Sequence, residues 1–68
     1  MVRVVAELLP DRRRVEVELE KGTVAELLER LGLSREGAVV VRDGTPLVEE
    51  EVLRDEERVL VYRAASGG

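Results

Sequence analysis

The chain has 68 residues with a formal net charge of -4, which leaves room for one small domain. It contains neither cysteine nor histidine. These absences exclude disulfides, cysteine-bound metal, a cysteine nucleophile and a histidine general base. We therefore expect a protein that is not itself an enzyme and that binds no metal or cofactor of its own.

Several bulk properties bear on source and location. Charged residues make up 38% of the chain, asparagine and glutamine are absent, and all of the 11 basic residues except one are arginine. The charged fraction and the missing amides favour a heat-adapted source, whereas the arginine bias would follow equally from a GC-rich genome. The longest apolar run, residues 38–41, is too short to cross a bilayer, so we expect a cytoplasmic monomer without a membrane partner. The negative charge argues against nucleic acid as the main partner.

Two alternating segments begin the chain. Residues 2–9, VRVVAELL, and residues 14–20, RVEVELE, both place apolar side chains at every second position. This period of two is typical of half-buried strands. Pro10 and Asp11 between them are turn residues, so the pair predicts a β-hairpin.

The period then changes to that of a helix. Thr23 and Glu26 form a T-x-x-E capping box, in which Thr23 accepts a hydrogen bond from the N–H three residues on. Gly32 can adopt the left-handed conformation that ends a helix. Apolar residues between them recur at the spacing of one helical face: Val24, Leu27, Leu28 and Leu31.

Three further strands are predicted. Residues 38–42, AVVVR, are apolar on both faces and indicate a central strand, and Asp43-Gly44 is a favoured hairpin turn. Pro46 suits a short edge strand, and residues 58–63, RVLVYR, form the last strand. The order is β-β-α-β-β-β, an α+β domain of residues 1–63 with one helix on one face of a mixed sheet of about five strands. Residues 64–68 are expected to be a flexible tail.

The charged clusters have plain interpretations. The basic run at residues 12–14 is expected to be a solvated loop, with phosphate contact as the alternative, although Tyr62 is the only aromatic residue. The acidic residues 49–51 and 55–57 match no calcium-loop pattern and indicate a solvated face or a docking rim for a basic partner. Lys21, the sole lysine, is expected on the surface.

The tail, AASGG, has little capacity to pack but a specific chemical potential. Five extended residues reach on the order of 16 Å, far enough to enter a partner's active site. Glycine lets the backbone pass through a narrow channel. A free carboxylate at Gly68 is a poor electrophile, so chemistry there requires activation by a separate ATP-using enzyme.

The combination resembles the ubiquitin-like β-grasp proteins, and among them the ThiS/MoaD-type sulfur carriers and the small archaeal modifier proteins. The resemblance spans nearly the whole chain and is carried by TVAELLERLGLS, VVVRDGTPL, LRDEERVLV and the terminal SGG. One departure is Asp55-Glu56-Glu57 where sulfur carriers usually have D-G-D, which leaves the conformation of that turn open.

The resemblance implies a function for the tail. An E1-like enzyme would adenylate the carboxylate of Gly68 with Mg and ATP, while Ser66 and Gly67 are held in its channel. The product would become a thiocarboxylate that donates sulfur for tRNA thiolation, thiamine or molybdopterin synthesis through a sulfurtransferase, or an isopeptide with a lysine of a target protein. Lys21 is a candidate conjugation acceptor. The partners would supply every catalytic group.

The resemblance also implies docking through the sheet face away from the helix, beside the last strand. With Leu60 and Tyr62 facing the core, the docking residues would be Val59, Val61 and Arg63, with Val5 and Val40 nearby. Both sets of alternate residues are apolar, so the opposite phase stays open. A different class of function is also open: a binding module with a passive tail that docks on a partner or RNA through the sheet or through residues 12–14.

Overall fold

Alternating apolar residues form the first hairpin of the computed structural model, which describes residues 1–63. Strand β1 is Val2–Leu9 and strand β2 is Arg13–Leu19. They pair antiparallel, with Ala6 opposite Val15. Every second side chain of β1 from Val4 onward is buried, while the intervening ones face the other side of the sheet. The hairpin predicted from the period of two is therefore confirmed.

Helix α1, Val24–Leu31, has the predicted ends. The hydroxyl of Thr23 accepts a hydrogen bond from the Glu26 N–H at 3.1 Å. Gly32 closes the helix at φ 74°, where its N–H donates to the last-turn carbonyls. The apolar stripe is buried at Val24, Leu27 and Leu28, so the helix presents one face to the sheet.

The second hairpin joins β3, Ala38–Arg42, to the short strand β4, Thr45–Leu47. Asp43 and Gly44 both have positive φ, 52° and 78°, as a two-residue hairpin turn of this type requires. Pro46 lies in β4, which is an edge strand of the sheet.

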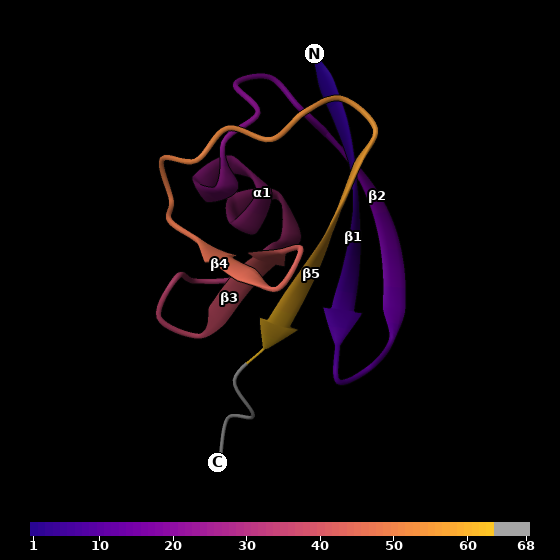
Figure 1. The fold of residues 1–68 in the computed structure, drawn as a ribbon, viewed down its shortest axis with the longest axis vertical. Helices are drawn as coiled ribbons and strands as arrows, with labels where there is room; N and C mark the ends of the chain where they lie inside the picture. The colour runs from indigo at the N-terminus through magenta and orange to yellow at the C-terminus, as the bar shows by residue number, and fades with distance from the viewer. Residues whose placement is uncertain (64–68) are drawn as a thin grey trace.

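Strand β5, Glu57–Arg63, is the middle strand of the sheet, whose order is β2-β1-β5-β3-β4 (Figure 1). It pairs parallel with β1 and antiparallel with β3. The helix covers one face of this mixed sheet (Figure 1). The predicted α+β arrangement, β-β-α-β-β-β, is confirmed, and the last strand begins one residue earlier than expected.

The segment between β4 and β5 is anchored to the helix. The N–H groups of Val24 and Ala25 donate to the carbonyls of Glu51 and Glu49 at 3.0 and 3.1 Å, so the segment satisfies donors that the first turn of a helix leaves free. Before β5, Glu56 has φ 66°, a conformation that glycine adopts most easily. The turn at residues 55–57 thus has left-handed backbone at its central position although no glycine stands there.

The core lies between α1 and the sheet. Within residues 1–63 it contains no buried polar or charged side chain. Leu53 reaches it from the segment before β5 and is 1% exposed. The remaining buried residues come from the helix and four strands: Val4, Ala6, Leu8, Leu19, Val24, Leu27, Leu28, Ala38, Val40, Val59 and Val61.

Candidate functional site

The last residues of β5, which precede the tail, are held in place by contacts with neighbouring elements. Tyr62 is paired with Leu9 of β1 on one side and with Val39 of β3 on the other. The guanidinium of Arg63 forms an ion pair with Asp11 of the first hairpin, Nη1 to Oδ2, at 2.9 Å. The chain therefore leaves the middle of the sheet at a position held by both neighbouring strands. The predicted tail, with its recognition residues Ser66 and Gly67 and its reactive residue Gly68, lies outside the described residues.

The expected phase of β5 is wrong. Val59 and Val61 are 3% and 0% exposed and belong to the core, so their side chains do not form a docking surface. The physical reason is the parallel register with β1, in which Ala6 is paired with Val59 and Leu8 with Val61. Paired residues point to the same face of a sheet, and this face of β1 packs under the helix.

The same correction applies to Val40, which is 1% exposed and also lies in the core. The residues of β5 that point away from the helix are Arg58, Leu60 and Tyr62, the second of the two phases that the sequence left open. Arg63 is exposed at the end of the strand, as expected.

The sheet face opposite the helix, here termed the open face, carries an apolar strip. In one row Leu60 of β5 lies between Glu7 of β1 and Val41 of β3. In the next row Tyr62 lies between Leu9 and Val39. Tyr62 and Val39 are each 47% exposed, which is high for large apolar residues in a sheet. An exposed apolar strip of this kind is typical of a surface that binds another molecule.

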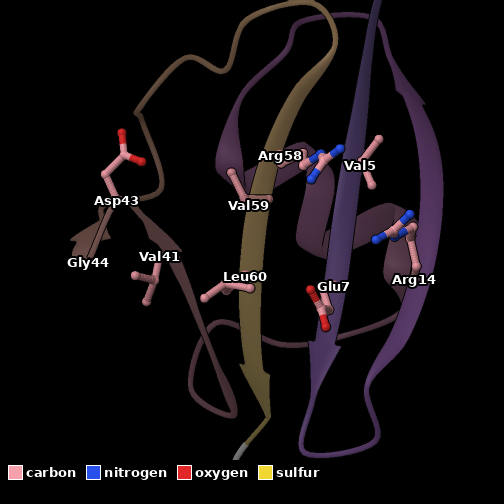
Figure 2. A pocket seen from close by; sticks show the side chains of 9 residues that line it. All are labelled: Val5, Glu7, Arg14, Val41, Asp43, Gly44, Arg58, Val59 and Leu60. Atoms are coloured by element: carbon pink, nitrogen blue, oxygen red, sulfur yellow. The ribbon is translucent and has the colours of Figure 1, made fainter.

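A hollow of about 350 Å³ lies on the open face (Figure 2). Its apolar lining includes Val5, Val41 and Leu60, and two arginines, Arg14 and Arg58, reach over it from β2 and β5. Sequence reasoning placed Val5 on this face but missed Arg58, Val41 and Leu60. The signal that identifies them is the parallel pairing of the first and last strands, which no local pattern contains.

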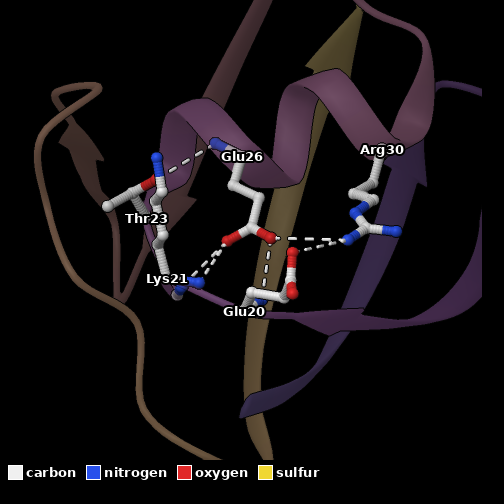
Figure 3. A network of polar contacts seen from close by, with 6 residues as sticks. Glu20, Lys21, Thr23, Glu26 and Arg30 are labelled. Atoms are coloured by element: carbon white, nitrogen blue, oxygen red, sulfur yellow. Dashed lines mark hydrogen bonds and ion pairs between the residues drawn. The ribbon is translucent and has the colours of Figure 1, made fainter. Parts of the chain in front are cut away.

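The basic run at residues 12–14 and the sole lysine, Lys21, lie in different parts of the fold. Residues 12–14 are exposed on the first hairpin, at the same end of the sheet as Arg63. Lys21 is exposed in the loop between β2 and α1. Its backbone N–H donates to the Glu26 carboxylate at 2.7 Å, so the side chain projects from an anchored loop (Figure 3).

Glu26 organises that loop. Its carboxylate accepts hydrogen bonds from the N–H groups of Glu20, Lys21 and Gly22 at 2.7, 2.7 and 3.0 Å. The bond from Glu20, followed by those from the next two residues, lowers the pKa of Glu26 against the opposing effect of burial. Arg30 lies 3.7 Å away, one helical turn on, and favours the same charged form (Figure 3).

The acidic run before β5 is partly neutralised within the fold. Glu49 forms an ion pair with Arg35 at 2.6 Å. Arg42 lies between Glu57 and Glu51, at 3.0 and 3.1 Å, and these hydrogen bonds raise its pKa. Several carboxylates of the predicted acidic rim therefore form ion pairs within the fold and are not free to bind a partner.

No cluster of three or more acidic residues in the described part of the chain could hold a metal ion. No helix among residues 1–63 is long and apolar enough to cross a membrane.

The fold, with one helix across a five-stranded mixed sheet and parallel first and last strands, is that of the ubiquitin-like β-grasp proteins. Residues 1–64 match the family model for small archaeal modifier protein 2, and the chain belongs to this family. The family consists of carriers and modifiers, which are substrates of other enzymes and not catalysts.

Two relatives extend the comparison. The chain is 42% identical over 60 residues to the sulfur carrier protein TtuB of Thermus thermophilus, covering 88% of this chain and 91% of the relative. It is 41% identical over 58 residues to an uncharacterised protein of Archaeoglobus fulgidus, covering 85% of each. The resemblance inferred from the sequence is thus confirmed at the level of the family.

Proposed function

We propose that this protein is a ubiquitin-like carrier whose Gly68 carboxylate is activated by an E1-like enzyme. The observation that carries the proposal is the family match over residues 1–64 together with the terminal Ser66-Gly67-Gly68 that follows it. The 42% identity to a sulfur carrier supports sulfur as the cargo.

The chemistry takes place on the tail. A carboxylate oxygen of Gly68 attacks the α-phosphorus of ATP, and pyrophosphate leaves, which gives an acyl-adenylate and removes the charge that makes the carboxylate unreactive. A persulfide on a sulfurtransferase then displaces AMP, which gives an acyl disulfide. A second thiol of the partner attacks the transferase sulfur of that disulfide, so the thiocarboxylate of Gly68 leaves and a disulfide forms on the partner. Attack of a lysine amine on the activated acyl group gives an isopeptide instead.

The chain's own contribution is recognition and presentation. The activating enzyme uses ATP and Mg, whereas this chain binds neither. The open face, with Leu60 and Tyr62 beside the start of the tail, is the docking surface that we assign in place of Val59 and Val61. For conjugation, Lys21 is the only side-chain amine that this chain can offer as an acceptor, and its anchored loop presents that amine to solvent.

Intact-mass spectrometry tests the proposal. The protein is purified from its native host, or incubated with the host's E1-like enzyme, ATP and a sulfur source. We expect one of two products. The first is an increase in mass that corresponds to exchange of one oxygen for sulfur at Gly68, and the second is an adduct in which Gly68 is joined to a lysine amine of a target protein.

A chain lacking Gly68 should show neither product, whereas Arg54→Ala, a change at an exposed residue that precedes β5 and so lies at the opposite end of that strand from the tail, should behave as wild type. The absence of both products from wild type, with no effect of deleting Gly68, would leave the alternative of a binding module with a passive tail.

A further inference from the structure

Strand β2 is an edge strand of the sheet whose outer side has no neighbour in the described chain (Figure 1). It pairs with β1 alone, and no backbone–backbone hydrogen bond within residues 1–63 joins it to any other element. Its seven residues, Arg13–Leu19, contain no proline. On such an edge every second residue leaves a backbone N–H and C=O free to pair with another strand.

The opposite edge of the sheet is protected against such pairing. Strand β4 has only three residues, and Pro46 at its centre has no N–H group to donate. Of the two edges, β2 is therefore the one that can form a longer ladder with a further strand. Pairing of β2 with β2 of another molecule occupies both free edges, so it gives a closed pair of chains and not an open fibre.

The charges on β2 are ordered along the strand. Arg14 lies near its start, and Glu16 and Glu18 follow on the same face of the sheet. Val15 and Val17, between them, are half-buried on the helix side. A strand that is basic at one end and acidic at the other is complementary to a second copy that runs antiparallel to it.

The charged side chains of this strand are available to a second molecule. Arg14, Glu16 and Glu18 are all exposed. The one ion pair that β2 forms among the described residues joins Arg3 to Glu16 at 3.7 Å, between side chains that are 49% and 62% exposed. A contact this long and this exposed contributes little, so Glu16 can approach another cation at small cost.

One antiparallel register satisfies the charges of both copies. When Val15 lies opposite Val15 of the second copy, Arg14 of each chain lies opposite Glu16 of the other. A register centred on Arg14 or on Glu16 places two like charges opposite each other, which is destabilising. A register centred on Val17 places Glu16 opposite Glu18 in both halves. The register centred on Val15 avoids these repulsions and also brings the two half-buried valines together.

We propose that β2 binds β2 of a second copy of this chain, in an antiparallel pair centred on Val15 that joins the two sheets. Arg12 has φ 60°, so the extended backbone begins at Arg13 and the ladder spans residues 13–17. So short a ladder buries less area than a stable dimer needs, and we expect a Kd on the order of a millimolar.

The pairing has two consequences for the molecule. The monomer expected from the sequence is the state of the dilute protein, and the dimer forms where the protein is concentrated. Strand β1 separates β2 from β5, so the pairing leaves the end of β5 uncovered and the dimer presents two tails. The inference does not depend on the proposed function, because neither an activating enzyme nor chemistry at Gly68 enters it.

Sedimentation equilibrium and nuclear magnetic resonance of the full chain, from micromolar to several millimolar protein, test the association. We expect the average mass to rise toward that of a dimer, with the largest concentration-dependent amide shifts at residues 13–17. A constant mass would overturn the proposal. Shifts concentrated at β4, or at Leu60 and Tyr62 of the open face, would overturn it as well.

Exchange of charge between two variants tests the register. Arg14→Glu and Glu16→Arg each place like charges opposite one another, so each variant alone should associate about tenfold more weakly than wild type. An equimolar mixture of the two again places opposite charges at both positions and should associate at least as well as wild type. Circular dichroism checks that each variant is folded, and recovery in the mixture itself requires two folded chains.

Glu36→Arg mixed with Arg54→Glu is the matched control, because both residues are exposed, lie outside β2 and undergo the same changes of charge. Each control variant alone, and their mixture, should associate as wild type does. A β2 mixture as weak as its components would overturn the proposed register. An equal gain in the control mixture would show that net charge governs the association, and it would overturn the proposal too.

Discussion

Among single residues, Glu26 has an organising role that its position in a capping box does not reveal. Its N–H completes the cap with Thr23, but its carboxylate reaches back to three N–H groups of the preceding loop. The side chain is 11% exposed, so water competes weakly for these bonds. One residue thereby joins the end of β2 to the start of α1 and holds the loop that carries Lys21.

Glu26→Gln should lower the thermal midpoint at neutral pH, because an amide oxygen accepts these bonds less strongly and its NH₂ group meets donors. The pKa of Glu26 is lowered in the fold relative to its ordinary value of 4.5. Its stabilising contribution is therefore complete above that value and is lost as pH falls through the lowered pKa. The difference between wild type and variant should shrink on acidification, as measured by circular dichroism melts from pH 7 to pH 2.

Glu29→Gln provides the control for this comparison, since Glu29 is exposed on the same helix and its carboxylate makes no hydrogen bond or ion pair within residues 1–63. Its melting curve should follow wild type at each pH. A constant difference between wild type and Glu26→Gln across the pH range would show that the carboxylate charge is not what holds the loop.

At the scale of elements, β5 decides which apolar residues pack under the helix and which lie on the open face. It is the middle strand, its two faces are both largely apolar, and its tail-proximal end is paired on both sides. Val59 and Val61 are in the core, while Arg58, Leu60 and Tyr62 lie on the open face. The strand thus joins the core, the open face and the start of the tail.

Alanine substitutions at adjacent positions of β5 test this phase. Val61→Ala should lower the free energy of unfolding by about 2 kcal/mol, because it removes fully buried methyl groups and leaves a cavity. Leu60→Ala removes more carbon but from a half-exposed site, and should cost about 1 kcal/mol or less. Urea unfolding of both variants measures the difference; a larger loss for Leu60→Ala would reverse the assignment of faces.

For the molecule as a whole, the described residues contain a complete apolar core. Its members run from Val4 to Val61, and the last buried position precedes the predicted domain boundary at Arg63. Charged groups lie outside this core, and two arginines, Arg35 and Arg42, are paired with carboxylates of residues 49–57. Stability therefore rests mainly on the apolar core, while the charged groups lie at the surface.

The boundary between domain and tail stays a prediction that truncation can test. A chain ending at Arg63 should unfold at nearly the temperature of the full chain, since the core of residues 4–61 remains intact. Differential scanning calorimetry measures this, and the truncated chain should show no product in the mass assay for Gly68. A substantially lower melting temperature would place residues 64–68 within the cooperative unit.

Much of the fold follows from local patterns in the sequence. The period of two in residues 2–9 and 14–20, the cap at Thr23, the stop at Gly32 and the turn at Asp43-Gly44 each depend on neighbours a few residues away. The order of elements and the family resemblance follow from these signals. The absence of histidine and cysteine likewise predicts a chain whose chemistry depends on other enzymes.

The faces of β5 and the hollow depend on tertiary structure alone. Residues 59–62 are apolar at every position, so alternation cannot say which side faces the helix. The parallel pairing with β1 decides it, by aligning Ala6 with Val59 and Leu8 with Val61 across more than 50 residues of sequence. The sequence by itself determined what elements form; only their packing determined that Arg58 and Leu60, and not Val59 and Val61, face away from the helix.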